Sequence, residues 1–171
     1  EMEIGILNLY PKFYEQAELA KEEMENLDCS KMVEASVKRG KILHGSYNYH
    51  NVLFQDEDII TTNFEKCAYG IQVMDLYGFF RKFMEKNNWN TEKGLQMLRA
   101  YQKNREIEKE EGKLLYLLFL FPEKFWKQMN FYYNGKKSWM SMKNLDKIKK
   151  LEEQEERRKK FLGEVKRVLF S

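Results

Sequence analysis

The chain begins with an amphipathic pattern that predicts helix over most of residues 10–39. Apolar side chains recur there at steps of three and four, and charged residues fill the opposite face. Pro11 suits a first helical turn, because proline has no N–H to donate. Asp28 or Ser30 can cap a second helix, and Gly40 provides a C-terminal stop. The recurring apolar residues are Tyr10, Phe13, Tyr14, Ala17, Leu19, Ala20, Met24 and Leu27.

Between residues 42 and 62 the helical period gives way to short β-type segments around a polar loop. The loop, residues 44–51, has the sequence HGSYNYHN and separates two apolar segments. A polar turn then returns the chain through a β-branched segment that ends at Asn63. A hairpin brings its two ends together, so we expect loop 44–51 and residues 63–65 to form one compact polar site. In order, the segments are 42–43, the loop 44–51, 52–54, the turn 55–58 and 59–62.

Helical patterns resume after this hairpin. Residues 71–85 are strongly apolar and carry Asp75, a charged residue that needs partners if it is buried. Residues 87–90, rich in asparagine, interrupt the pattern. Thr91 begins a further helix, which we expect to run on to the glutamates of residues 106–111.

Two more segments follow Gly112, which separates them from the preceding helix. Residues 114–121 form an apolar helix end that Pro122 stops. The aromatic-rich segment 125–133 is typical of side chains packed in the core, and it stops at a turn signal at Asn134-Gly135.

The last segment, about residues 145–170, predicts an exposed helix. Four glutamates precede four basic residues, so ion pairs at i and i+4 support a solvated helix. We expect its C-terminal end to dock on the body of the domain, and a partner-binding helix is the alternative. The charged run is Glu152, Glu153, Glu155 and Glu156, followed by Arg157, Arg158, Lys159 and Lys160.

Charge and cysteine content exclude several classes of protein. The 171 residues hold 30 Lys and Arg against 27 Asp and Glu, without the basic clustering that nucleic-acid binding needs. Cys29 and Cys67 alone cannot build a disulfide framework or a zinc cluster. The apolar run 114–121 is too short to cross a bilayer, and the acidic start at Glu1 and Glu3 lacks the basic region of a signal peptide. We therefore expect one globular domain with no nucleic-acid or membrane partner and no secretion.

The loop and the residues after the hairpin resemble a known pair of motifs. HGSYNYHN followed by TNFE is similar to the catalytic and metal-binding loops of the aminoglycoside-phosphotransferase and choline-kinase-like superfamily, HGDxxxxN and then a strand ending in DF(D/E). Within it, the tyrosines, the Glu-Lys-Cys after Phe64 and Asp75-Leu76 resemble the spore-coat CotS-like proteins of endospore-forming bacteria. The resemblance implies a mainly α (α+β) fold, the helical C-terminal lobe of a protein-kinase-like fold with a short β-hairpin bearing the loop motifs. That lobe would span 1–171, with its specific motifs in 43–76.

The resemblance also gives the polar residues expected roles. Ser46 stands where the family has its catalytic Asp, and Asn63 stands where it has a metal-holding Asp. A serine hydroxyl does not take a proton as a carboxylate does, and an amide oxygen is a weak ligand for Mg²⁺. Asn51 matches the second metal ligand of the family. Glu65 is the nearby carboxylate that would have to replace Asn63 in a working metal site.

The residues expected to support the loop are retained. In the family the counterpart of His44 tethers the loop through backbone hydrogen bonds, next to Gly45, and the counterpart of Asp75 bonds the backbone of the catalytic loop. No GxGxxG or GxxxxGK motif occurs, and residues 1–42 before the loop are helical in pattern. The resemblance therefore covers the C-terminal lobe and not the N-terminal nucleotide-binding lobe of such kinases. A serine hydrolase is disfavoured because the chain has no GxSxG motif.

These observations favour a catalytically silent kinase-like domain, a pseudokinase, with a structural or protein-interaction role. The resemblance implies other spore coat proteins as partners, a place in the mother-cell cytoplasm and spore coat, and no cofactor in this chain. One alternative is an active ATP-dependent small-molecule or sugar phosphotransferase that uses Mg and ATP through Asn51 and Glu65. A further alternative is a helical adaptor module that keeps only the ancestry of the fold.

Overall fold

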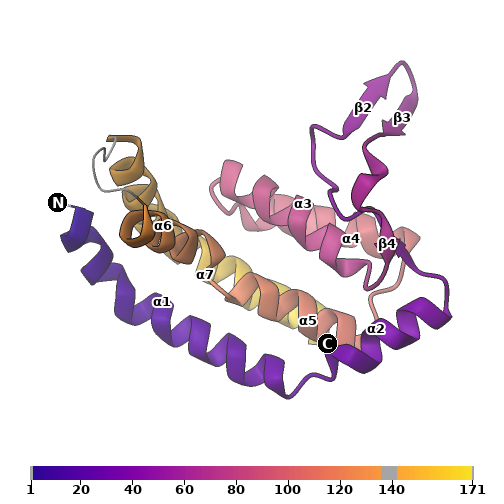
Figure 1. Cartoon of the computed structure of the whole chain (residues 1–171). Helices are drawn as coiled ribbons and strands as arrows, with labels where there is room; N and C mark the ends of the chain where they lie inside the picture. Colours follow the sequence, from indigo (N-terminus) through magenta and orange to yellow (C-terminus); the bar gives the residue numbers. More distant parts are fainter. Residues whose placement is uncertain (1, 136–141, 171) are drawn as a thin grey trace.

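The structure, a computed structural model, describes residues 2–135 and 142–170. Seven α-helices in these residues accompany four short strands and a 3₁₀ turn. The helices are α1 (Met2–Glu25), α2 (Cys29–Lys38), α3 (Val73–Lys86), α4 (Thr91–Asn104), α5 (Lys109–Leu120), α6 (Glu123–Asn134) and α7 (Met142–Phe170). The strands are β1 (Ile42–Leu43), β2 (Val52–Gln55), β3 (Asp58–Thr61) and β4 (Ala68–Tyr69), and the 3₁₀ turn is η1 (Phe64–Lys66). The β2–β3 hairpin projects away from the helices (Figure 1).

The strands form two antiparallel pairs, β1 with β4 and β2 with β3. Gln55 pairs with Asp58, so that Asp56 and Glu57 make the turn of the hairpin. Asp56 has a φ of 52°, a left-handed conformation that aspartate adopts more readily than most residues. Because β1 precedes the polar loop and β4 follows η1, their pairing holds the two polar segments at the same end of the hairpin.

The main core lies between α3, α4, α5 and α7. Phe80, Phe119 and Phe161 are each at most 2% exposed, and their ring centroids lie 5.1 to 5.7 Å apart in edge-on contacts. Such geometry is favourable for aromatic pairs. A second cluster joins α1, α6 and α7, where Phe13 packs against Phe125. Among the described residues, no helix combines the length and hydropathy needed to cross a membrane.

The C-terminal helix packs on the body of the domain along its length, and not only at its C-terminal end as the sequence predicted. Helix α7 packs against α1, α4, α5 and α6, and it lies along α5 in Figure 1. Its residues Ile148, Phe161 and Val165 are at most 1% exposed. Glu155 and Arg158 are 3% and 7% exposed, and they pair with each other at 3.3 Å. The other six residues of the charged run are exposed, so the charge pattern misled only at this internal pair, because charges that pair in the interior can have the same spacing as charges on a solvated helix.

Other boundaries also differ from the predictions. Helix α1 begins at Met2, so Pro11 lies inside the helix and not in its first turn. The glutamates of residues 106–111 do not extend α4. Glu108 and Glu111 instead form a capping box at the start of α5, which satisfies N–H groups that would otherwise have no partner. Gly112 consequently lies inside α5 and does not separate two helices.

Candidate functional site

Loop 44–51 joins β1 to β2 and is anchored to the first turn of α3. Asp75 accepts hydrogen bonds from the backbone N–H of His44 at 2.5 Å and from that of Gly45 at 3.0 Å. Each carboxylate oxygen takes one bond, and hydrogen bonds to an ionised acceptor are stronger than neutral ones. Asp75 therefore fixes the backbone where the loop begins.

His44 ties the loop to the end of the hairpin. Its Nε2 lies 2.8 Å from the carbonyl oxygen of Thr62, and its Nδ1 accepts from the backbone N–H of Ser46 at 3.2 Å. Because a carbonyl only accepts and an N–H only donates, this pattern assigns the proton to Nε2. The ring is buried and packs on Phe64, with centroids 4.7 Å apart. Both ring nitrogens are engaged, so His44 tethers the loop to the end of the hairpin.

Ser46 and Asn51 meet around one backbone carbonyl. The carbonyl oxygen of Ser46 accepts from Nδ2 of Asn48 and from Nδ2 of Asn51, both at 2.8 Å. The same Asn51 nitrogen lies 3.5 Å from Ser46 Oγ, and the backbone carbonyl of Asn51 accepts from the N–H of Thr62. The side-chain nitrogen of Asn51 thus donates to the loop backbone. Its Oδ1 is the atom that remains available as a cation ligand.

Asn63 and Glu65 lie at the turn that follows the hairpin. Asn63 has a φ of 65°, which asparagine tolerates better than most residues, and its side chain does not cap η1. Glu65 is exposed. Nowhere in residues 2–135 and 142–170 do three His, Cys, Asp or Glu side chains gather closely enough to hold a metal ion. A hydroxyl and two amides, from Ser46, Asn51 and Asn63, do not fit Mg²⁺, which prefers carboxylate oxygens.

A ring of polar contacts behind the loop was not predicted from the sequence. Gln72 donates to the carbonyl of Ile42 at 2.9 Å and accepts from Nε of Arg105 at 2.8 Å. Arg105 also pairs with Glu111 at 2.5 Å, and Lys41 closes the ring with Glu111 at 3.4 Å. Burial is the largest single effect and lowers the pKa of Arg105, but the hydrogen bonds and charges of Glu111 and Tyr101 together outweigh it, so the pKa of Arg105 is raised. The partners lie up to 70 positions apart, so local periodicity gave no signal for them.

A comparison with protein families shows which family the chain belongs to. The family described as "Spore coat putative kinase YutH" matches residues 6–165. The chain belongs to this YutH family.

The fold of this YutH-family chain is also known from a solved structure. The crystal structure of an aminoglycoside phosphotransferase from Alicyclobacillus acidocaldarius subsp. acidocaldarius DSM 446 matches with a TM-score of 0.85 and 20% sequence identity. The match covers 95% of this chain and 48% of that one, so the chain spans about half the length of the phosphotransferase. At this identity the likeness shows the fold alone. Among curated proteins, none matches the chain.

The comparisons confirm two predictions for the YutH-family chain. The resemblance to spore coat proteins with a kinase-like fold is confirmed, and so is the mainly helical fold with a β-hairpin, as in the C-terminal region of such phosphotransferases. The chemical roles expected at Ser46, Asn51, Asn63 and Glu65 stay predictions.

Replacing Asp75 with Asn is expected to loosen the loop of this YutH-family chain. An amide offers one acceptor oxygen, and its nitrogen would face the second backbone N–H, donor against donor. An unpaired donor costs about 1–3 kcal/mol where it is buried, and less at the N–H of Gly45, which is exposed. Amide hydrogen exchange at His44 and Gly45 should therefore become faster. The control is Asp58→Asn in exposed β3, and equal exchange in both variants would contradict the role of Asp75.

Proposed function

We propose that this chain is a catalytically silent kinase-like domain of the spore coat, with a structural or protein-interaction role. One observation carries the proposal. The hydrogen bonds that hold the backbone of the loop are present, while the side chains at the family's reactive positions are uncharged. Asp75 and His44 hold the backbone of the loop through four hydrogen bonds. Ser46 and Asn63, at the family's reactive positions, bring no carboxylate.

The chemistry of phosphoryl transfer supports this proposal. The reaction depends on positioning, on neutralisation of phosphate charge by Mg²⁺ and on a group that orients or deprotonates the acceptor hydroxyl. The hydroxyl of Ser46 can donate or accept a hydrogen bond, but it does not take up a proton near neutral pH. The Nδ2 of Asn51 is bonded to the loop backbone. These groups preserve a shape and supply little of the chemistry.

The β2–β3 hairpin supports an interaction role. Phe54 and Ile59 pair on one face of this ribbon, and Leu53 and Ile60 pair on the other. Their exposed fractions are 78%, 65%, 50% and 39%. A two-stranded ribbon that shows apolar side chains on both faces is typical of a surface that another protein covers. We propose other spore coat proteins as its partners, and the mother-cell cytoplasm and spore coat as its location, on the strength of the family.

An active phosphotransferase is the second candidate, and Glu65 is the observation that favours it. This carboxylate follows Asn63 by two positions and is exposed, so in that case it would hold Mg and ATP together with Asn51. Phosphate transfer from Mg-ATP by the full-length protein, lost on Asn51→Ala, would overturn the silent domain. If neither the full-length protein nor its Asn51→Ala variant transfers phosphate, the result supports the silent domain. A helical adaptor, the third candidate, predicts that partner capture survives changes in the loop and fails without residues 147–170.

Restoring the two missing carboxylates is expected to create Mg²⁺ affinity. In Ser46→Asp/Asn63→Asp two anionic ligands join Asn51 on the loop, and Mg²⁺ prefers such ligands. Isothermal titration should show roughly tenfold tighter Mg²⁺ binding than in the unchanged protein, about 1.4 kcal/mol. Asn104→Asp/Asn130→Asp adds the same charge at exposed positions of α4 and α6 and serves as the control. If both double variants gain the same Mg²⁺ affinity, the added negative charge alone explains the binding and the loop does not form a specific site.

A further inference from the structure

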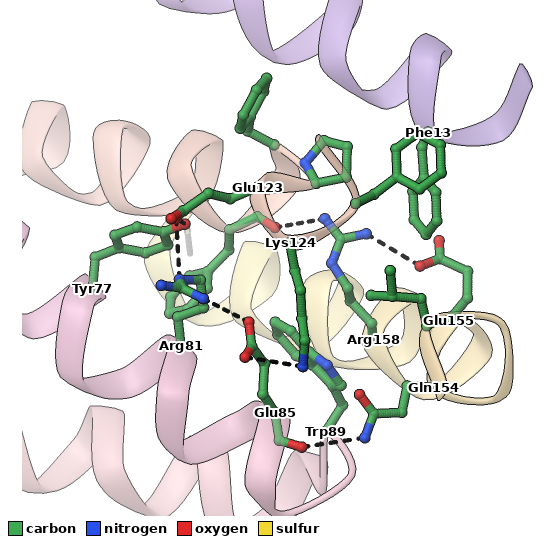
Figure 2. A pocket seen from close by; sticks show the side chains of 15 residues that line it. Phe13, Tyr77, Arg81, Glu85, Trp89, Glu123, Lys124, Gln154, Glu155 and Arg158 are labelled. Atoms are coloured by element: carbon green, nitrogen blue, oxygen red, sulfur yellow. Dashed lines mark hydrogen bonds and ion pairs between the residues drawn. The ribbon is translucent and has the colours of Figure 1, made fainter. Parts of the chain in front are cut away.

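A small cavity lies apart from loop 44–51, where α3, the start of α6 and α7 meet (Figure 2). Its volume is about 30 Å³, which is room for one or two water molecules. Aromatic rings, among them Trp89 and Phe119, form part of its wall, and polar side chains form the rest. A ligand for this cavity must therefore be very small.

The charges around the cavity are already matched with one another. Three basic side chains face three carboxylates, and Figure 2 shows these pairs along the wall. An ion would therefore find no unmatched charge here, and a neutral ligand is favoured. The pairs are Arg81 with Glu85 (2.6 Å), Arg81 with Glu123 (3.1 Å), Lys124 with Glu85 (3.2 Å) and Arg158 with Glu155 (3.3 Å).

The side-chain amide of Gln154 has a fixed orientation in this wall. Its Nε2 donates to the backbone carbonyl of Glu85 at 3.2 Å and to Oδ1 of Asn88 at 2.7 Å. Both hydrogens of the nitrogen are thereby used. Turning the amide over would set its oxygen against two acceptors, so the contacts determine which end of Gln154 is the carbonyl.

The carbonyl oxygen of Gln154 lacks a protein partner. Gln154 is 3% exposed and lines the cavity. Its Oε1 accepts no hydrogen bond from any group in residues 2–135 and 142–170. Buried acceptors in folded proteins are paired with a protein donor or with ordered water. The amide therefore calls for a neutral donor that fits a cavity of this size.

We propose that this cavity is a binding site for a neutral hydroxyl group, supplied by a buried water molecule that donates to Gln154 Oε1. Water has the required size, carries no charge and can donate without a counter-ion. Through Gln154 it joins α7 to the end of α3, where Glu85 and Asn88 hold the other end of the amide. The site is independent of the proposed function of the loop.

Oxygen-17 magnetic relaxation dispersion, which counts long-lived water molecules, tests the proposal in the full chain. Gln154→Met keeps the length of the side chain and removes the carbonyl, so the variant is expected to lose one long-lived water. Gln102→Met makes the same change on partly buried α4 and should lose none. An unchanged count in Gln154→Met overturns the proposal.

A high-resolution crystal structure of the unchanged protein gives a second test that does not depend on the variant folding. Electron density for a single oxygen about 2.6–3.2 Å from Gln154 Oε1 supports the water. Native mass spectrometry separates the two sources of a hydroxyl, because a small alcohol from the cell would add its mass to the protein. Such added mass, or density without any atom at that distance, overturns the bound water.

Discussion

Gly45→Ala is expected to lower the free energy of unfolding by about 2–5 kcal/mol. Gly45 has a φ of 73°, and a left-handed conformation costs a residue with a Cβ about 1–2 kcal/mol. A Cβ at this position would also lie 2.2 Å from the carbonyl oxygen of Lys66, so the loop or η1 must move. Forced displacement of a packed contact adds about 1–3 kcal/mol. Urea denaturation of both proteins measures the difference.

Gly40→Ala is a matched control for this prediction. Gly40 has a φ of 64°, and an added Cβ would meet no atom within 4 Å. It carries the same conformational cost of about 1–2 kcal/mol without the clash. The difference between the two variants isolates the close approach of the loop to η1. Equal losses of stability would contradict that approach.

The close approach also explains how the loop keeps its geometry independently of the side chains of Ser46 and Asn63. The N–H of Gly45 donates to Asp75 while its α-carbon lies against the backbone of Lys66. The loop is thus clamped between α3 and η1 by backbone contacts. Ser46 and Asn63 take no part in this clamp, so their side chains can change without loss of the fold. The structural and the chemical parts of the motif are physically separable.

The parts of the fold that could be predicted depend on local patterns. Asp28 caps α2 through the N–H of Lys31, Pro122 follows the end of α5, and the β2–β3 hairpin matches its predicted segments to within one residue. Each of these features is decided by residues within a few positions of one another. The same holds for HGSYNYHN, whose side chains mostly bond within the loop.

The features that the sequence did not reveal depend on distant partners. Arg105 falls inside the helix predicted from Thr91 onward, and only its contacts with Gln72 and Glu111 show that it supports β1. Arg158 looked like a solvated charge, yet it is buried against the end of α5. Spacing shows which face of a helix a residue is on. It does not show what another helix brings to that face.

Arg158→Met is expected to cost about 3–5 kcal/mol, the loss typical of breaking a buried ion pair by removing one partner. The guanidinium donates to the carbonyls of Phe119 and Leu120 at 2.8 and 2.7 Å, which are among the last carbonyls of α5 and have no partner within the helix. Burial lowers the pKa of Arg158, and Glu155 opposes that effect. Methionine leaves both carbonyls and the carboxylate of Glu155 without this donor. Urea denaturation measures the loss.

Two further variants separate the buried charge from a general effect of removing an arginine. Arg167→Met removes an arginine that is 78% exposed and pairs with Glu164 at 3.1 Å, and exposed pairs contribute about 0–1 kcal/mol. Adding Glu155→Gln to Arg158→Met should recover part of the stability, because among the described residues the buried carboxylate is otherwise left with only a distant cation, Lys12 at 3.9 Å. If the double variant is less stable than Arg158→Met, then Arg158 acts through the carbonyls of α5 and not through Glu155.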